Sequence, residues 1–234
     1  DDVPEDSGLW AAHELADHET IARLTTGVKR FDLPQEFNHI AILKDVIARG
    51  GDEKRQALES LINERMNRHQ YSQAAELLRE MKQLASAGDD KKNVQARIDQ
   101  IVKNWMQIQS SNTLPAGKGA TFDVRFRNGS HISFDARPIN IDALLTDVRK
   151  YIESKPEQLD HNLMQIQNIG WMLINGDREK YLSKSVAQWE LDVKPPENHF
   201  DAMVTVTSPL QKANAYWITA KMRDGNSAQS VLWV

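Results

Sequence analysis

The sequence has no cysteine, few aromatic residues and no long apolar run. Because none of the 234 residues is cysteine, disulfides, thiolate metal sites and cysteine nucleophiles are excluded, while both reducing and oxidising compartments stay open. No stretch approaches the roughly 20 apolar residues that a membrane-spanning helix needs. Lys and Arg total 29 against 33 Asp and Glu, and this net charge of -4 argues against a nucleic-acid or anionic-membrane surface.

What remains is an ordinary globular composition, with 40% hydrophobic and 26% charged residues. The length suits one large domain or two smaller ones, each with a real core. The chain begins Asp1-Asp2-Val3-Pro4 without an initiator Met or signal peptide and ends on an apolar strand pattern at 231–234. We therefore expect a fragment of a longer protein that itself neither inserts into a membrane nor binds nucleic acid.

Catalytic motifs are also missing: the sequence has no nucleophile elbow, P-loop or dinucleotide fingerprint. Three histidines have a carboxylate close by in sequence: His131 with Asp135, His161 with Asp160, and His199 with Asp201. A His–Asp pair can orient an imidazole for base catalysis. Seven His among 33 carboxylates produce such neighbours by chance. The sequence therefore predicts no enzyme activity, no catalytic residue and no cofactor.

The stretch HELADH at 13–18 is similar to the zinc-protease pattern HExxH, but its two histidines are five residues apart. Two ligands share a helix face at a spacing of four, whereas a spacing of five rotates the second ligand by about 140°. We predict a solvated surface helix over residues 9–24 and no metal site.

Four stretches between residues 35 and 109 repeat apolar residues with a period of 3.6: 35–49, 52–68, 72–87 and 90–109. Their short connections predict neighbouring antiparallel helices, and their mixed surface charges indicate solvation. The stretch RHQYSQAAELL at 68–78 resembles the Y-x-x-A entry of a tetratricopeptide helix pair. A short helical array with a concave peptide-binding groove is therefore one hypothesis.

After residue 110 the helical period stops in the polar, breaker-rich stretch SSNTLPAGKG. Residues 121–127 and 130–137 then alternate around Asn128-Gly129, which predicts a hairpin with a type I′ turn. Four more strands are predicted at 189–193, 202–207, 215–222 and 230–234, the last two joined by a tight turn at Asp224-Gly225-Asn226. The alternating tryptophans Trp189, Trp217 and Trp233 are expected to fill the core between the sheets; with Trp171 they could instead line a carbohydrate or ligand surface.

Two helical patterns interrupt the strands, one capped by Asn140 and a second over 168–182. The predicted fold is therefore α+β. An N-terminal antiparallel helical, tetratricopeptide-like domain covers 1–110, and a linker covers 111–119. An antiparallel β-sandwich of immunoglobulin-like type covers 120–234, with a helical insertion at about 139–183.

Eight stretches of the chain resemble the region ahead of the macroglobulin domains in large bacterial alpha-2-macroglobulin-like proteins, particularly the planctomycete type. They are residues 30–38, 126–129, 145–151, 168–170, 186–191, 199–201, 207–216 and 220–227. The similarity is strongest after residue 118 and departs at Asn214, where the family pattern has Gly.

The resemblance implies a secreted, periplasmic or envelope-associated protease trap that is cleaved in a bait segment and rearranges its β domains. Many such proteins tether the protease through a Cys-Gln thioester, and this cysteine-free chain would leave that element elsewhere. The resemblance thus implies a non-catalytic scaffold and interaction segment, with no site residue to carry over. Its partners would be other domains of the same longer chain, and proteases or an envelope protein. The alternative is a stand-alone helical-repeat module that binds proteins or peptides.

Overall fold

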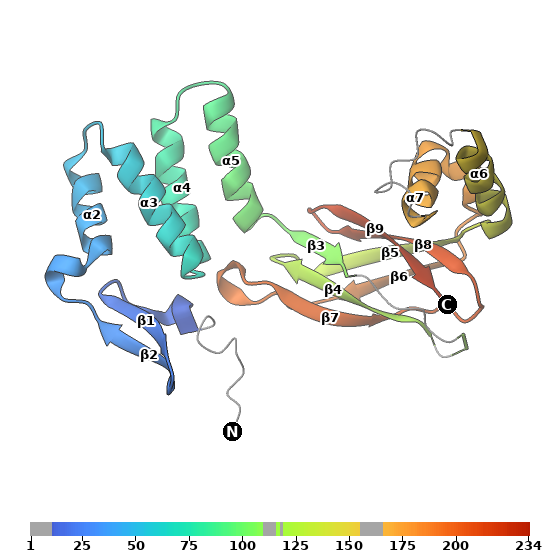
Figure 1. Ribbon diagram of the computed structural model, residues 1–234, viewed down its shortest axis with the longest axis horizontal. Helices are drawn as coiled ribbons and strands as arrows, with labels where there is room; N and C mark the ends of the chain where they lie inside the picture. Colours follow the sequence, from blue (N-terminus) through green and yellow to red (C-terminus); the bar gives the residue numbers. More distant parts are fainter. Residues whose placement is uncertain (1–10, 110–115, 118, 155–165) are drawn as a thin grey trace. The chain divides into compact units, whose positions relative to one another are not determined.

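The computed structural model describes residues 11–109, 116, 117, 119–154 and 166–234 (Figure 1). They form a mixed α and β chain whose sheets are all antiparallel. Two compact units are present. The first contains the described residues up to Lys103 together with Glu197–Phe200, and the second contains Asn104–Pro196 and Asp201–Val234. No helix among the described residues is long and apolar enough to cross a membrane.

The first unit contains a β-hairpin and four consecutive α-helices. Its elements are η1 (Ala11–Glu14), β1 (Glu19–Leu24), β2 (Gly27–Asp32), η2 (Gln35–Phe37), α2 (His39–Arg49), α3 (Lys54–Asn67), α4 (Tyr71–Leu84), α5 (Asp89–Val102) and η3 (Glu197–His199). The predicted helix over 9–24 is wrong for its described part, because β1 and β2 pair from Glu19↔Asp32 to Leu24↔Gly27. The β-branched residues Thr20 and Ile21 favour this extended backbone.

The helix predicted from residue 35 begins at His39 instead, because Asn38 is its N-cap. The Asn38 Oδ1 accepts a hydrogen bond from the Ala41 N–H at 3.0 Å. The apolar stripes of α3, α4 and α5 pack together as predicted, around Leu58, Ile62, Ala74, Ala75, Leu78, Met81, Val94, Ile98 and Ile101. Phe200, from the connection that follows η3, packs beside this core with its ring 5.5 Å from Tyr71 and 5.1 Å from His13.

The helix predicted at 90–109 corresponds to α5. It ends at Val102 rather than at residue 109, and Trp105–Ile108 form strand β3. Tertiary pairing overrides the helical period here. The Met106 N–H donates to the Asn226 Oδ1 at 2.8 Å, and the Asn226 Nδ2 donates to the Met106 carbonyl at 2.9 Å. Most of the linker predicted at 111–119 lies outside the described residues.

The second unit is built on two antiparallel sheets. Its further strands are β4 (Thr121–Arg127), β5 (His131–Pro138), β6 (Ala187–Asp192), β7 (Ala202–Thr207), β8 (Ala215–Met222) and β9 (Ser227–Trp233). The strand orders are β3-β4-β7 and β6-β5-β8-β9. Alternate residues of both sheets bury one shared core, in which the rings of Phe122 and Phe134 meet edge to face at 5.8 Å.

The hairpin predicted at Asn128-Gly129 is wrong, because β4 and β5 lie in different sheets. Asn128 takes a positive φ of 62°. At Gly129, however, the missing side chain allows another residue to pack closely, and no type I′ turn forms. A Cβ on Gly129 would lie 2.1 Å from the Met222 Sδ. The hairpin predicted at residues 224–226 is confirmed, since β8 pairs with β9 and the Met222 N–H donates to the Asn226 carbonyl at 3.0 Å.

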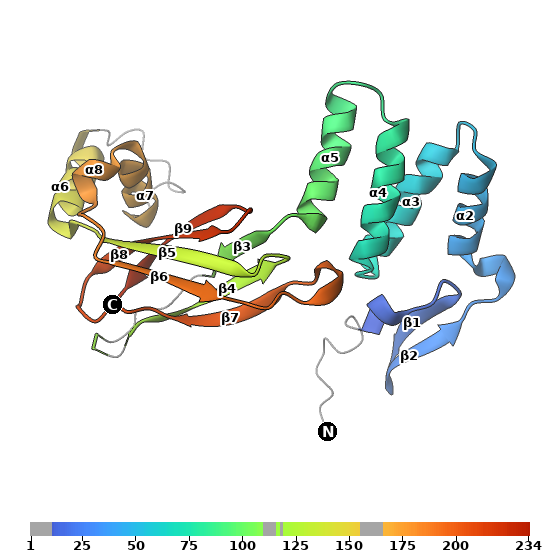
Figure 2. The same cartoon turned by 180° about the vertical axis from the view of Figure 1, so that it is seen from behind.

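Three helices cover one part of the outer face of the four-stranded sheet (Figures 1 and 2). They are α6 (Ile141–Ser154), α7 (Ile166–Gly176) and α8 (Arg178–Tyr181), within the insertion predicted at 139–183. As predicted, Asn140 caps α6, and its Oδ1 accepts from the Ala143 N–H at 3.1 Å.

The tryptophans separate onto different faces of the four-stranded sheet. Trp189 packs against the core between the sheets and stacks on Phe134 at 5.1 Å, as predicted. The prediction is wrong for Trp217, which packs under the helices at 4.5 Å from Trp171. It is also wrong for Trp233, which is 48% exposed. Since β8 is buried on both faces, alternation alone does not identify which side is the core.

Candidate interaction site

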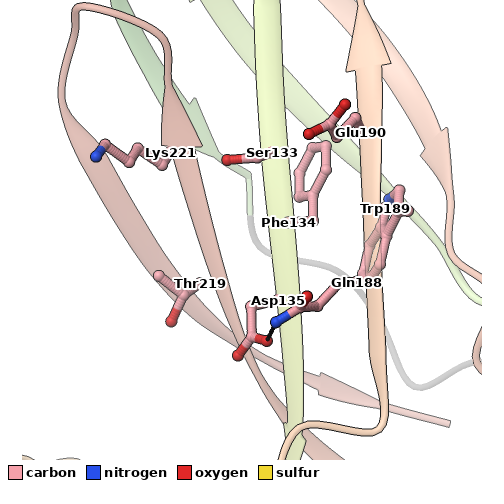
Figure 3. Close-up of a pocket in the computed structure, with 8 residues that line it drawn as sticks. All are labelled: Ser133, Phe134, Asp135, Gln188, Trp189, Glu190, Thr219 and Lys221. Atoms are coloured by element: carbon pink, nitrogen blue, oxygen red, sulfur yellow. Dashed lines mark hydrogen bonds between the residues drawn. The ribbon is translucent and has the colours of Figure 1, made fainter.

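The outer face of the four-stranded sheet bears an open pocket of about 430 Å³ (Figure 3). Its lining comes from β5, β6 and β8: Ser133, Phe134, Asp135, Gln188, Trp189, Glu190, Thr219 and Lys221. Ser133 and Asp135 alternate with the core residues Ile132 and Phe134, so the period of two that builds the core also directs these polar side chains outward.

Strand register sorts the polar side chains into two rows across the sheet. In one row Asp135 lies opposite Gln188 and Thr219. The Gln188 Nε2 donates to the Asp135 Oδ1 at 2.9 Å (Figure 3). The Ser185 hydroxyl donates to the same oxygen at 2.6 Å. Asp135 is therefore held in place by two donors.

In the second row Ser133 lies opposite Glu190 on one side and Lys221 on the other. This row presents an anionic, a neutral polar and a cationic group in sequence across three strands. The pocket can therefore offer hydrogen bonds and both signs of charge to a polar ligand or a protein surface. Its wall also contains the Trp189 Nε1, a buried donor without a hydrogen-bond partner.

The structure describes two of the three histidines that have a carboxylate close by in sequence, His131 and His199. The His131 Nδ1 lies 2.7 Å from the Asp192 Oδ1, so His131 pairs with Asp192 and not with Asp135. Asp201 accepts a hydrogen bond from the Arg127 Nε at 2.8 Å. His161 and Asp160 lie outside the described residues.

The segment with His13 and His18 has no ligand geometry either. Residues Ala11–Glu14 make a single 3-10 turn, and the His18 Nε2 lies 3.7 Å from the Asp32 Oδ1. Across the residues that the structure describes, no group of three or more His, Cys, Asp or Glu side chains comes together to hold a metal ion.

A second polar cluster, missed by the sequence analysis, lies in the first unit. The charged residues Arg65 and Arg68 were predicted to be solvated, and Gln70 was not singled out. All three are buried, with 3%, 5% and 7% of their surface exposed, respectively. Main-chain carbonyls of the segment ahead of β1 accept hydrogen bonds from Arg68 and Gln70. The Arg68 Nη1 donates to the Ala16 carbonyl at 3.0 Å, and the Gln70 Nε2 donates to the Leu15 carbonyl at 2.8 Å.

Arg65 connects this cluster to a carboxylate. Its Nη2 donates to the Asp17 Oδ1 at 2.6 Å, and its Nη1 donates to the Gln70 Oε1 at 2.5 Å. Burial alone would raise the pKa of Asp17, but hydrogen bonds from Lys44 and Arg65 outweigh burial and hold that pKa below 3.8. The sequence did contain a sign that Arg65 is buried. Arg65 follows Leu61 by four residues and Ile62 by three, so it lies on the same face of α3 as the apolar stripe.

Together these features define a mixed α+β protein with antiparallel sheets. No family model matches the sequence, and no curated protein matches it. Three solved structures of Escherichia coli alpha-2-macroglobulin are similar over 56% of the chain. The crystal structure spanning domains MG0-NIE-MG1 has a TM-score of 0.32 at 13% identity, and the one spanning NIE-MG1 has 0.31 at 14%. The cryo-EM structure of the native conformation has 0.30 at 14%. The chain covers 39%, 61% and 8% of their lengths, respectively.

Proposed function

We propose that the chain is a non-catalytic scaffold and interaction segment of a large alpha-2-macroglobulin-like protein that traps proteases outside the cytoplasm, in the cell envelope or beyond it. One observation carries the proposal: sheets of three and four antiparallel strands share a single core, and the pocket outside that core is lined mainly by polar side chains. This arrangement supports a macroglobulin-like sandwich whose role is to hold and contact other domains.

The helical unit fits the same proposal as a tetratricopeptide-like array. In such a helix pair small residues allow the helices to approach closely. Ala74 and Ala75 of α4 are fully buried in the core that α3, α4 and α5 share. The chain has no cysteine, so a thioester would be supplied by another part of the full protein. The proposed partners are the other domains of that protein, together with a protease or an envelope protein.

The test is to express the reading frame continued beyond Val234, add a general protease, and follow the products by gel filtration. The proposal predicts that a single cleavage yields a compacted species that retains the protease. The 234-residue chain alone should neither hydrolyse substrates nor retain the protease. Simple degradation of the longer chain without capture would contradict the trapping role.

A second candidate is a stand-alone module that binds extended peptides through its helices. The observation in its favour is that Arg68 and Gln70 bind main-chain carbonyls of the segment between η1 and β1, at Ala16 and Leu15 respectively. A labelled synthetic peptide of residues 9–18 would then bind the chain saturably in fluorescence anisotropy, in competition with the chain's own segment. A peptide of reversed sequence is the control, and equal binding of the two would reject this candidate.

A further inference from the structure

Strand β7 is an edge of the three-stranded sheet, and half of its backbone faces away from β4. The Ser208 N–H donates to the Ala120 carbonyl at 2.8 Å, which fixes the alternation of hydrogen bonds along the β4–β7 register. By that alternation Met203, Thr205 and Thr207 direct their N–H and C=O groups to the free side. Among the described residues, no other strand pairs with them.

Two of the other edges of the sheets are closed or charged. On β3 the Asn226 side chain forms hydrogen bonds with the main-chain N–H and C=O groups of Met106. Strand β9 also has no charge and no proline, but it contacts β3. On β6 the Val193 N–H donates to the Ser130 carbonyl, so the residues facing its free side are Gln188, Glu190 and Asp192. Two of those three are acidic, a common device against edge-to-edge pairing.

Strand β7 has no such protection. Its sequence, AMVTVT, has no charge and no proline, and its partner register with β4 runs without a bulge. The outward side chains of Thr205 and Thr207 are exposed, and Met203 is 59% exposed. β-branched residues of this kind fit a paired strand well. The free backbone therefore fits another extended, uncharged strand.

We propose that the occupant is β7 of a second copy of this chain, paired antiparallel about a twofold axis through Thr205. In that register Thr205 faces Thr205 of the partner subunit, and Met203 faces Thr207 of the partner subunit. These are the residues whose N–H and C=O groups are free, so each facing pair exchanges two hydrogen bonds. The pairing joins two three-stranded sheets into one continuous six-stranded sheet.

The side chains support a self-complementary interface. On the core side Val204 faces Val206 of the partner subunit, which extends the apolar row of each core across the axis. On the outer side only Met and Thr meet, and Thr–Thr pairs are favourable across strands. The same geometry at β6 would bring Glu190 against like charge. The small contact implies a reversible dimer in the micromolar range.

Sedimentation velocity of the 234-residue chain over a wide concentration series tests the proposal. The wild type should pass from monomer to dimer as concentration rises. Thr205→Lys places two like charges on the axis and should weaken the dimer by about tenfold or more. Thr205→Pro removes an N–H that points to solvent in the monomer, together with the hydroxyl that donates to the Asp123 Oδ1 at 2.7 Å, and it should weaken the dimer similarly. Thr146→Lys, at an exposed position of α6, is the matched control and should leave the dimer unchanged.

Disulfide crosslinking tests the register in which the two β7 strands pair. Since the chain has no cysteine, Thr205→Cys introduces a single thiol. Facing residues of a hydrogen-bonded pair have Cα atoms about 5.5 Å apart, within the range of a disulfide. Oxidation should therefore yield a covalent dimer from Thr205→Cys and none from Thr146→Cys. A monomer at every concentration, or a dimer that persists in both Thr205→Lys and Thr205→Pro, would overturn the proposal.

Discussion

Arg65 and Arg68 bring two guanidinium groups almost completely out of water in the first unit. Such burial is tolerated only when nearby oxygens satisfy the charge. Asp17 and Gln70 satisfy Arg65, while Glu64 and the Ala16 carbonyl satisfy Arg68. The cluster therefore fastens the segment ahead of β1 to the end of α3, and its removal would leave unpaired polar groups inside the unit.

The substitution Arg65→Ala should cost about 3 kcal/mol of unfolding free energy, because it leaves the Gln70 Oε1 without its donor and removes one of the two cations that bind Asp17, the other being Lys44. This is the lower end of the range for a broken buried pair, since the Asp17 side chain is 35% exposed. Urea denaturation followed by circular dichroism measures the loss. Arg55→Ala removes an exposed ion pair with Asp90 and serves as the control, with little change expected. Equal effects of the two substitutions would contradict the structural role of the cluster.

The same cluster makes stability depend on pH in the acid range. Burial raises the pKa of Glu64, but hydrogen bonds from Arg68 and His39 outweigh it and lower the pKa below 4.5, as Lys44 and Arg65 do for Asp17. A folded pKa below the unfolded value contributes stability that is present above the unfolded pKa and lost as pH falls through the folded pKa. The contribution of these carboxylates should therefore be constant from about pH 7 to pH 5 and decline below about pH 4.

Asp17→Asn should flatten this acid dependence, because its amide no longer titrates. The measurement is the difference in unfolding free energy between pH 7 and pH 3 for wild type and variant. Asp89→Asn is the control, since the Asp89 side chain is 93% exposed. An Asp17→Asn variant that loses as much stability on acidification as the wild type would refute this account.

Among the elements, the connection between β4 and β5 shows why two similar turn sequences have different structures. Asn128-Gly129 passes the chain from one sheet to the other, and Asp224-Gly225-Asn226 closes a hairpin within one sheet. Locally both have turn chemistry and flanking alternation. What differs is non-local: Met222, on a strand far along the sequence, packs against the backbone of Gly129.

Gly129→Ala should therefore destabilise the second unit by about 1–3 kcal/mol through overpacking, since Met222 is fully buried and has little room to move. Thermal unfolding measures the change. In a Met222→Ala background the added methyl group should cost little or nothing, which a double-mutant cycle resolves. Gly176→Ala, where a Cβ would meet no atom within 4 Å, is the control. An undiminished penalty in the Met222→Ala background would exclude the contact as its cause.

Much at the element scale could be predicted from periodicity. The stripes of α3 to α5, the alternation of β4 to β7 and the Asn140 cap follow from local patterns. Partner choice could not be predicted, because strand pairing and the ending of α5 before β3 depend on residues distant in sequence, such as Asn226. For the pocket, alternation placed Ser133 and Asp135 opposite the core. Nothing local showed that β6 and β8 would flank them or that His131 would meet Asp192.

For the whole molecule, the two compact units have separate apolar cores. One core is built from α3, α4 and α5, and the other from the facing sides of the two sheets. We expect differential scanning calorimetry to resolve two transitions. Arg65→Ala should lower the melting temperature of one transition, and Gly129→Ala should lower that of the other. A single transition that both substitutions shift equally would contradict independent cores.

The four residues Glu197–Phe200 have a practical consequence for anyone who divides the gene. The first unit is discontinuous in sequence, because the ring of Phe200 packs against Tyr71 and His13 from more than a hundred residues away. A truncated gene that stops at Lys103 would encode every α-helix of that unit and still omit η3 and this aromatic contact. The same constraint applies to gene recombination during evolution, because a single breakpoint cannot transfer both parts of the first unit together.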